Sequence, residues 1–228
     1  MKENMISMDE HSLPILKDGV LYELMMLKDV EDAVECLAET FVDSEPITRA
    51  LGITVADFRV FANFFCQNAV KEELSVIARD QNTGKMMGCL ISEDLVTRLP
   101  QNLETSFPKF APIISLMRKM DKDYIYKNNV DKNEVMHEFL LGVYPEWQGR
   151  HIGENLIICS MIQGRVMNYR GAIAEIGNPV TMHMHEETRG FYVVGDVKYK
   201  DFVYDHSKVF KDIITDDNKS CKLVYKAI

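Results

Sequence analysis

The period of the hydrophobic positions changes several times along the chain, and each period predicts one type of element. The apolar run VLYELMML at 20–27 has the length of a strand. Apolar residues recur at helical spacing after Asp29, which is a potential N-cap. They do so again after Thr54, which forms a capping box with Asp57. Two consecutive helices are therefore predicted, with these apolar faces: Val30, Ala33, Val34, Leu37, Ala38 and Phe41, then Phe58, Phe61, Ala62, Phe65 and Ala69.

Alternating positions predict the strands that follow. The alternation near Leu74–Ala78, the turn Asn82–Gly84 and the apolar run 85–92 are typical of a hairpin. The strongest strand is 134–143, EVMHEFLLGV, and strict alternation would place every second residue from Val135 to Val143 on one face. Further strands are expected at 171–176, 197–204 and 220–226, and further helices at 111–120, 153–169 and 180–189.

This order of elements predicts a mixed α/β (α+β) fold with helices on the faces of one sheet. The length of 228 residues suits one domain. We expect an N-terminal tail at 1–18 and a single domain at 19–228, with an insertion at about 95–133 that lies on the domain.

Composition and charge limit the classes of partner that this protein is expected to bind. Lys and Arg total 26 against 35 Asp and Glu, so the formal net charge of −9 argues against nucleic acid, whose phosphates require a basic face. No apolar run is long enough to span a membrane, and the N-terminus does not resemble a signal peptide. Five scattered cysteines suit reduced thiols, so a cytoplasmic protein is expected, as monomer or homodimer.

A strand, a glycine-containing loop and a helix start at 134–153 form the main candidate site. Unpaired amides and the positive end of a helix dipole attract phosphates, and glycines allow a close approach. Gly149 and Gly153 supply the small positions, and Arg150 adds a positive charge. A tight turn with close helix–sheet packing explains the same residues equally well.

The segment LGVYPEWQGRHIG resembles the acetyl-CoA-binding motif of the GNAT superfamily, a strand ending in L-x-V followed by Q/R-x-x-G-x-G/A. Gln148 and Gly153 match this pattern, whereas His151 stands where the first glycine is usual. The resemblance implies that acetyl-CoA is the cosubstrate. It implies this set of cofactor-binding residues: Leu141, Gly142, Val143, Gln148, Gly149, Arg150, His151, Ile152 and Gly153.

Looser strings resemble the arylalkylamine N-acetyltransferase-like proteins of invertebrates. They are FVDSEPITRALGIT, LSVIARDQNTGKMMGCLISED and GDVKYKDFVYD. The resemblance implies a GNAT fold, with a mostly antiparallel sheet of about seven strands, about four flanking helices and a central splay. It also implies acetyl transfer, in a ternary complex, to the primary amine of a small molecule, an arylalkylamine first and a polyamine second.

The same resemblance implies catalytic roles. Glu45 of the Glu-Pro stretch becomes the candidate base, and a backbone N–H near Val143 becomes the donor to the thioester carbonyl. The tyrosine or serine that such enzymes carry as the acid is absent between Thr181 and Arg189, so His185, or water, takes that place. No metal site is expected. A degenerate acyl-CoA-binding regulatory module and a peptide or protein N-acetyltransferase remain as alternatives.

Overall fold

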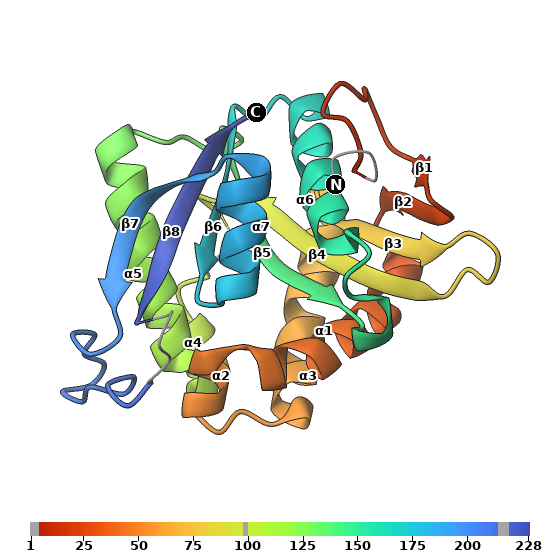
Figure 1. Cartoon of the computed structure of the whole chain (residues 1–228). Helices are drawn as coiled ribbons and strands as arrows, with labels where there is room; N and C mark the ends of the chain where they lie inside the picture. Colours follow the sequence, from red (N-terminus) through yellow and green to blue (C-terminus); the bar gives the residue numbers. More distant parts are fainter. Residues whose placement is uncertain (1–4, 98–99, 214–218) are drawn as a thin grey trace.

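A single twisted sheet forms the centre of the molecule (Figure 1). The computed structural model describes residues 5–97, 100–213 and 219–228. Its strands lie in the order β1-β2-β3-β4-β5-β6-β8-β7, and only β5 and β6 run parallel to each other. The strands are β1 (Ile15–Lys17), β2 (Val20–Leu24), β3 (Val76–Asp80), β4 (Met86–Asp94), β5 (Val135–Val143), β6 (Gly171–Ile176), β7 (Tyr192–Lys198) and β8 (Ser220–Ala227).

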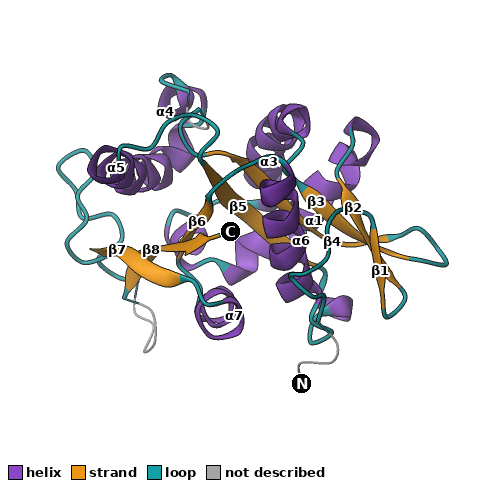
Figure 2. Ribbon diagram, turned by 90° about the horizontal axis from the view of Figure 1, so that it is seen from above, coloured by secondary structure: helices purple, strands orange, loops and turns teal. Residues whose placement is uncertain are grey.

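Helices cover both faces of this sheet (Figure 2). The α-helices are α1 (Val30–Ser44), α2 (Pro46–Ala50), α3 (Val55–Ala69), α4 (Leu103–Ser106), α5 (Ala111–Asn128), α6 (Ile152–Val166) and α7 (Pro179–Arg189). One hydrophobic core lies between the sheet and α1, α3 and α5, and a second lies under α6 on the opposite face. Among the described residues, no helix has the length and apolarity that a membrane crossing requires.

Local signals predicted the starts of α1 and α3 with different success. The capping box of α3 is confirmed, because Thr54 Oγ1 accepts from Asp57 N at 3.2 Å and Asp57 Oδ2 accepts from Thr54 N at 3.0 Å. Asp29 stands at the N-cap of α1 but does not cap it with its side chain. Its carboxylate instead accepts from Met26 N at 2.8 Å and pairs with Arg79 Nη2 at 2.5 Å.

Three boundaries differ from the sequence-based expectation. The segment assigned to an N-terminal tail contains β1, which pairs with β2. The insertion holds α4 as well as α5, and α5 continues to Asn128. The strand expected at 197–204 is wrong: β7 ends at Lys198, and Tyr199 and Phe202 of the following loop fill the core. Apolar character there reflects burial of a loop rather than a strand.

A bulge in β5 breaks the predicted alternation. Ile91 of β4 pairs with Leu140, but the next residue, Ser92, pairs with Glu138, so Phe139 is an extra residue in β5. Phe139 and Leu140 consequently both pack in the core under α1 and α3, whereas Leu141 and Val143 pack with α6. The expectation that alternate residues from Val135 to Val143 share one face is therefore wrong beyond the bulge.

The predicted central splay is present between β5 and β6. Their parallel ladder joins Val135–His137 to Gly171–Ile173 and then stops, although both strands continue. The second halves of the two strands thus diverge in the middle of the sheet (Figure 1). Side chains of both strands line the space that opens there.

Gly142 allows α1 to approach β5 closely, which makes the packing testable. A Cβ on Gly142 would lie 2.7 Å from Thr40 Oγ1 and 3.2 Å from Leu37 Cδ2, both on α1. We expect Gly142→Ala to lower the free energy of unfolding by about 1–3 kcal/mol through overpacking, measured by urea denaturation. Adding Thr40→Ala, which removes the nearest atom, should recover part of this loss. An equal loss in both variants would contradict the packing explanation.

Candidate functional site

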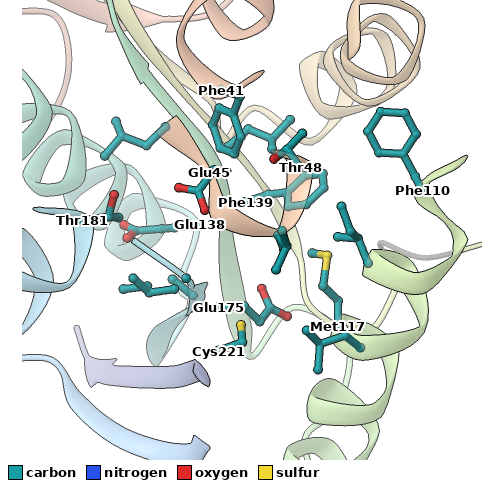
Figure 3. A pocket seen from close by; sticks show the side chains of 18 of the residues that line it. Phe41, Glu45, Thr48, Phe110, Met117, Glu138, Phe139, Glu175, Thr181 and Cys221 are labelled. Carbon is teal, nitrogen blue, oxygen red and sulfur yellow. The ribbon is translucent and has the colours of Figure 1, made fainter. Parts of the chain in front are cut away.

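Two hollows meet in the splay. The first, the inner cavity, measures about 100 Å³ and lies among α1, α2, α3, α5 and the open ends of β5 and β6 (Figure 3). The second, the loop groove, measures about 410 Å³ and runs between the start of α6 and the start of α7. Glu45, Leu141 and Thr181 line both of them, so these residues mark the junction.

The inner cavity combines aromatic walls with acidic groups. Phe61 stacks on Phe110 with ring centroids 4.2 Å apart, and Phe41 stacks on Phe58 at 5.1 Å. No lysine or arginine from the described part of the chain lines the cavity. Its ionisable oxygen and nitrogen groups are Glu45, Glu138, Glu175 and His185. Such a lining suits a small molecule with an apolar body and a positive charge.

Glu45 occupies the link between α1 and α2. Its extended backbone (φ −91°, ψ 120°) ends α1, and Pro46 starts α2. This arrangement directs the Glu45 carboxyl group into the cavity, as Figure 3 shows. Desolvation by the surrounding protein raises the pKa of Glu45 to about 7, and nearby Arg49 offsets only part of that rise. A carboxyl with this pKa can accept and release a proton near neutral pH.

His185 lies in the same cavity and is bonded on both ring nitrogens. Its Nδ1 is 2.8 Å from the carbonyl oxygen of Thr181, one helical turn earlier in α7, and its Nε2 is 3.1 Å from Glu138 Oε2. The ring also packs edge-on against Phe191, with centroids 4.8 Å apart. The His185 side chain is buried.

Sequence reasoning assigned no catalytic role to two of the three carboxylates of the cavity, Glu138 and Glu175. Glu138 of β5 faces α7, and its Oε2 lies within hydrogen-bond distance of His185 Nε2. Glu175 of β6 lies 2.5 Å from His137 Nε2 across the opening splay, while His137 Nδ1 lies 3.8 Å from Glu93. Neither residue stands in a recognisable motif; the only sequence signal was charge within otherwise apolar strands.

Tyr199 was missed as well. It follows β7, and its buried hydroxyl has no hydrogen-bond partner among the described residues. A Cβ on Gly177 would lie 2.7 Å from this hydroxyl and 3.4 Å from Glu45 Oε2, so Tyr199 and Glu45 approach Gly177 together. Burial, with smaller contributions from Cys221 and Glu45, raises the pKa of Tyr199 far above its usual value. The hydroxyl therefore stays protonated.

Most of the predicted cofactor residues line the loop groove. They are Leu141, Val143, Gln148, Gly149, His151, Ile152 and Gly153. Gln148 Nε2 donates to the carbonyl of Val143 at 3.0 Å and ties the loop to the end of β5. Two predicted residues do not line the groove: Gly142 packs against α1, and the Arg150 guanidinium lies 5.1 Å from the Trp147 ring centroid.

The start of α6 presents the features of an anion site, with one exception. Gly149 (φ 74°) and His151 (φ 59°) both have left-handed backbones, which turn the loop sharply into the helix. The first helical bond is Asn155 N to His151 O, so the preceding amides of the first turn are free of helical acceptors. The exception is Glu154, whose carboxylate pairs with His151 Nδ1 at 3.1 Å in that same turn.

Comparisons with solved structures define the fold. Arylalkylamine N-acetyltransferase 2 from Aedes aegypti is 17% identical, with a TM-score of 0.77 over 92% of this chain and all of that one. The C-terminal condensation domain of Ebony, solved with beta-alanyl-dopamine, is 16% identical, with a TM-score of 0.75 over 94% of this chain and all of that one. The Drosophila melanogaster polyamine N-acetyltransferase that forms N-acetylagmatine is 15% identical, with a TM-score of 0.73 over 92% and 100%.

No family model and no curated protein matches the sequence. The structural likeness nevertheless covers nearly the whole chain and includes the complete neighbouring domains. The chain therefore has the fold of the GNAT N-acetyltransferases, as the resemblance of the 141–153 segment implied. Over the described residues the sheet has eight strands rather than about seven, and α2 and α4 add to the expected helices.

The raised pKa of Glu45 predicts a pH-dependent stability. Between about 4.5, the ordinary value, and about 7 the folded protein binds a proton that the unfolded chain has released. Stability should therefore fall as pH rises through this window and should not change further above it on account of this group. We expect Glu45→Gln to gain stability relative to the wild type between pH 5 and pH 8, measured by urea denaturation at both pH values. A constant difference would show that Glu45 ionises normally.

Proposed function

We propose that the protein is an acetyl-CoA-dependent N-acetyltransferase that acts on the primary amine of a small molecule. The observation that carries this proposal is the junction at Glu45, where a cavity suited to an amine meets a groove suited to a phosphate-bearing cosubstrate. A carboxyl with a pKa of about 7 at that junction supplies the base that direct transfer needs.

The loop groove would bind acetyl-CoA. The amides at the start of α6 and the left-handed loop at Gly149 suit the pyrophosphate. The remainder of the cosubstrate would follow β5 past Val143 toward Leu141, where the splay leaves the strand without a β6 partner. The thioester would then lie at the junction, beside Glu45 and Thr181.

The inner cavity would bind the amine. Its phenylalanines suit an aryl or alkyl body, and its carboxylates suit the ammonium group. An arylalkylamine is the first substrate class and a polyamine the second; structural neighbours act on both, as their names state. A cavity of about 100 Å³ enclosed by α1, α3 and α5 favours a small molecule over a peptide.

The reaction is a direct transfer within the ternary complex. The Glu45 carboxylate removes a proton from the ammonium, and the neutral amine attacks the thioester carbonyl. Backbone donors at the end of β5, near Val143, would stabilise the negative oxygen of the tetrahedral intermediate. Collapse breaks the C–S bond, and the departing sulfur takes a proton, for which His185 is the candidate donor.

A catalytically degenerate acyl-CoA-binding module is the second candidate. Glu154 favours it, because a carboxylate in the first turn of α6 opposes a bound phosphate, and its partner His151 stands at the motif's first glycine. A protein of this kind would bind acetyl-CoA and free CoA but release no thiol with any amine.

Cosubstrate binding is tested with a pair of opposed variants. We expect calorimetric titration to show that the wild type binds acetyl-CoA and that Gly153→Val, which places a branched side chain at Met184 in the groove, binds it at least about tenfold more weakly. Glu154→Gln should bind about threefold more tightly at low salt, since it removes a negative charge from the helix start. Unchanged affinity in both variants would place the cosubstrate elsewhere.

Catalysis is tested at Glu45. With 2-phenylethylamine and 1,4-diaminobutane as probes, thiol release by the wild type should increase with pH through the Glu45 pKa of about 7. Glu45→Gln should lose about 100-fold or more in kcat/KM and should no longer show that acidic limb, while it still binds acetyl-CoA. Glu35→Gln, an exposed carboxylate paired with Arg59, is the control and should remain active. An unchanged pH profile in Glu45→Gln would exclude Glu45 as the base.

A further inference from the structure

Glu138 and His185 form a buried pair whose hydrogen bonds define its proton content. The carbonyl oxygen of Thr181 can only accept, so the 2.8 Å contact requires a proton on His185 Nδ1. The contact of 3.1 Å between Nε2 and Glu138 Oε2 then needs one further proton between the two atoms. The pair is therefore either an imidazolium with a carboxylate or an imidazole with a carboxylic acid.

Both descriptions give the pair a net charge of zero. The side chains are 3% and 1% exposed for His185 and Glu138, and an uncompensated charge at such a depth is unfavourable. If the pair lost the shared proton, or gained a second one, without a compensating transfer, it would carry such a charge. The pair is thus suited to give one proton and receive another in the same event.

Its position matches the place where such an exchange is needed. Both residues line the inner cavity, and Thr181, whose carbonyl contacts His185, lies at the junction with the loop groove. Figure 3 shows Glu138 beside Thr181. The other oxygen of Glu138, Oε1, is buried and has no hydrogen-bond partner among the described residues. A buried carboxylate oxygen in a cavity wall is a ready acceptor for an N–H group.

We propose that Glu138 is a second catalytic carboxyl, which accepts an N–H of the amine at Oε1 and works with His185 as a proton-exchange pair. This inference rests on the proposed function. When the C–S bond of the tetrahedral intermediate breaks, the shared proton moves to the departing sulfur. In exchange, the pair takes the second proton from the amine nitrogen, and this nitrogen becomes the amide nitrogen of the product. Glu45 holds the first proton and releases it to solvent, so one proton is released per turnover.

The different roles of Glu45 and Glu138 follow from their surroundings in the structure. Glu45 is partly exposed and can exchange its proton with water, whereas Glu138 is enclosed and bonded to His185. The base and the exchange pair lie on different elements, the α1–α2 link and β5 with α7, and Glu45, Glu138 and His185 all line the inner cavity. One nitrogen at the junction can thus face both.

Three variants test the pair, with 2-phenylethylamine and 1,4-diaminobutane as the amine probes: Glu138→Gln, His185→Gln and the double variant. Glu138→Gln preserves shape and can still bond to His185 Nε2 through its amide, but it cannot carry the exchanged proton. We expect each single variant to lose about 100-fold in kcat, with a much smaller change in the affinity for acetyl-CoA. The double variant should be within about threefold of either single one, because the two residues act as a unit.

The pH profile separates chemistry from packing. Glu138→Gln should have a lower kcat at every pH while its profile retains the acidic limb that Glu45 produces. Cooperative thermal unfolding and acetyl-CoA titration establish that each variant is folded. Glu138→Asp, which retains the carboxyl, serves if Glu138→Gln does not fold, and should recover activity above His185→Gln.

The two hypotheses fail in different ways. A wild type that releases no thiol with either probe overturns the proposed function together with this inference. An active wild type overturns this inference alone if Glu138→Gln retains its kcat or loses the acidic limb that Glu45 produces, or if the losses of the single variants multiply in the double variant. Glu35→Gln again serves as the control, since Glu35 is on the surface of α1 and pairs with Arg59.

Discussion

The end of the β5–β6 ladder is the constraint on which the site depends. Parallel strands normally continue their pairing, since unpaired buried backbone groups are unfavourable. Here the ladder stops after His137 and Ile173, and the two strands continue apart. Groups from both faces of the sheet can therefore reach one space, and the inner cavity contains residues that belong to both hydrophobic cores.

The bulge at Phe139 changes which core each residue of β5 faces beyond it. Four consecutive residues of β5, from Glu138 to Leu141, line the cavity, and so do four consecutive residues from Ala174 to Gly177 at the end of β6, because the splay opens to both faces of the sheet. Glu138 contacts His185 of α7, and Phe139 packs against the aromatic side chains of α3. The insertion adds Phe110 and Met117 as the far wall, so the insertion helps to form the site instead of only decorating the surface.

The ionisable groups of the site differ in their protein environments and hence in what they can do. Glu45 is desolvated, which raises its pKa to about 7, and Arg49 offsets only part of this rise. Glu138 is bonded to a histidine that the helix backbone orients, and Glu175 is bonded to another histidine, His137. Tyr199 remains a neutral phenol behind Gly177. Three carboxyl groups of one residue type thus have three different surroundings within one cavity.

The sequence by itself determined most of the elements and the loop groove. Helical spacing, the Thr54 capping box and the strand–loop–helix segment at 134–153 depend on residues close together in the chain, and all appear in the structure. Tertiary structure alone decided the bulge, the packing of Tyr199 and the pairing of Glu138 with His185, residues separated by 47 positions. No local pattern encodes these features, because they arise where strands diverge and distant segments share one space. The cavity that joins Glu45 to these groups therefore could not be predicted from the sequence, although the resemblance singled out Glu45 as a candidate.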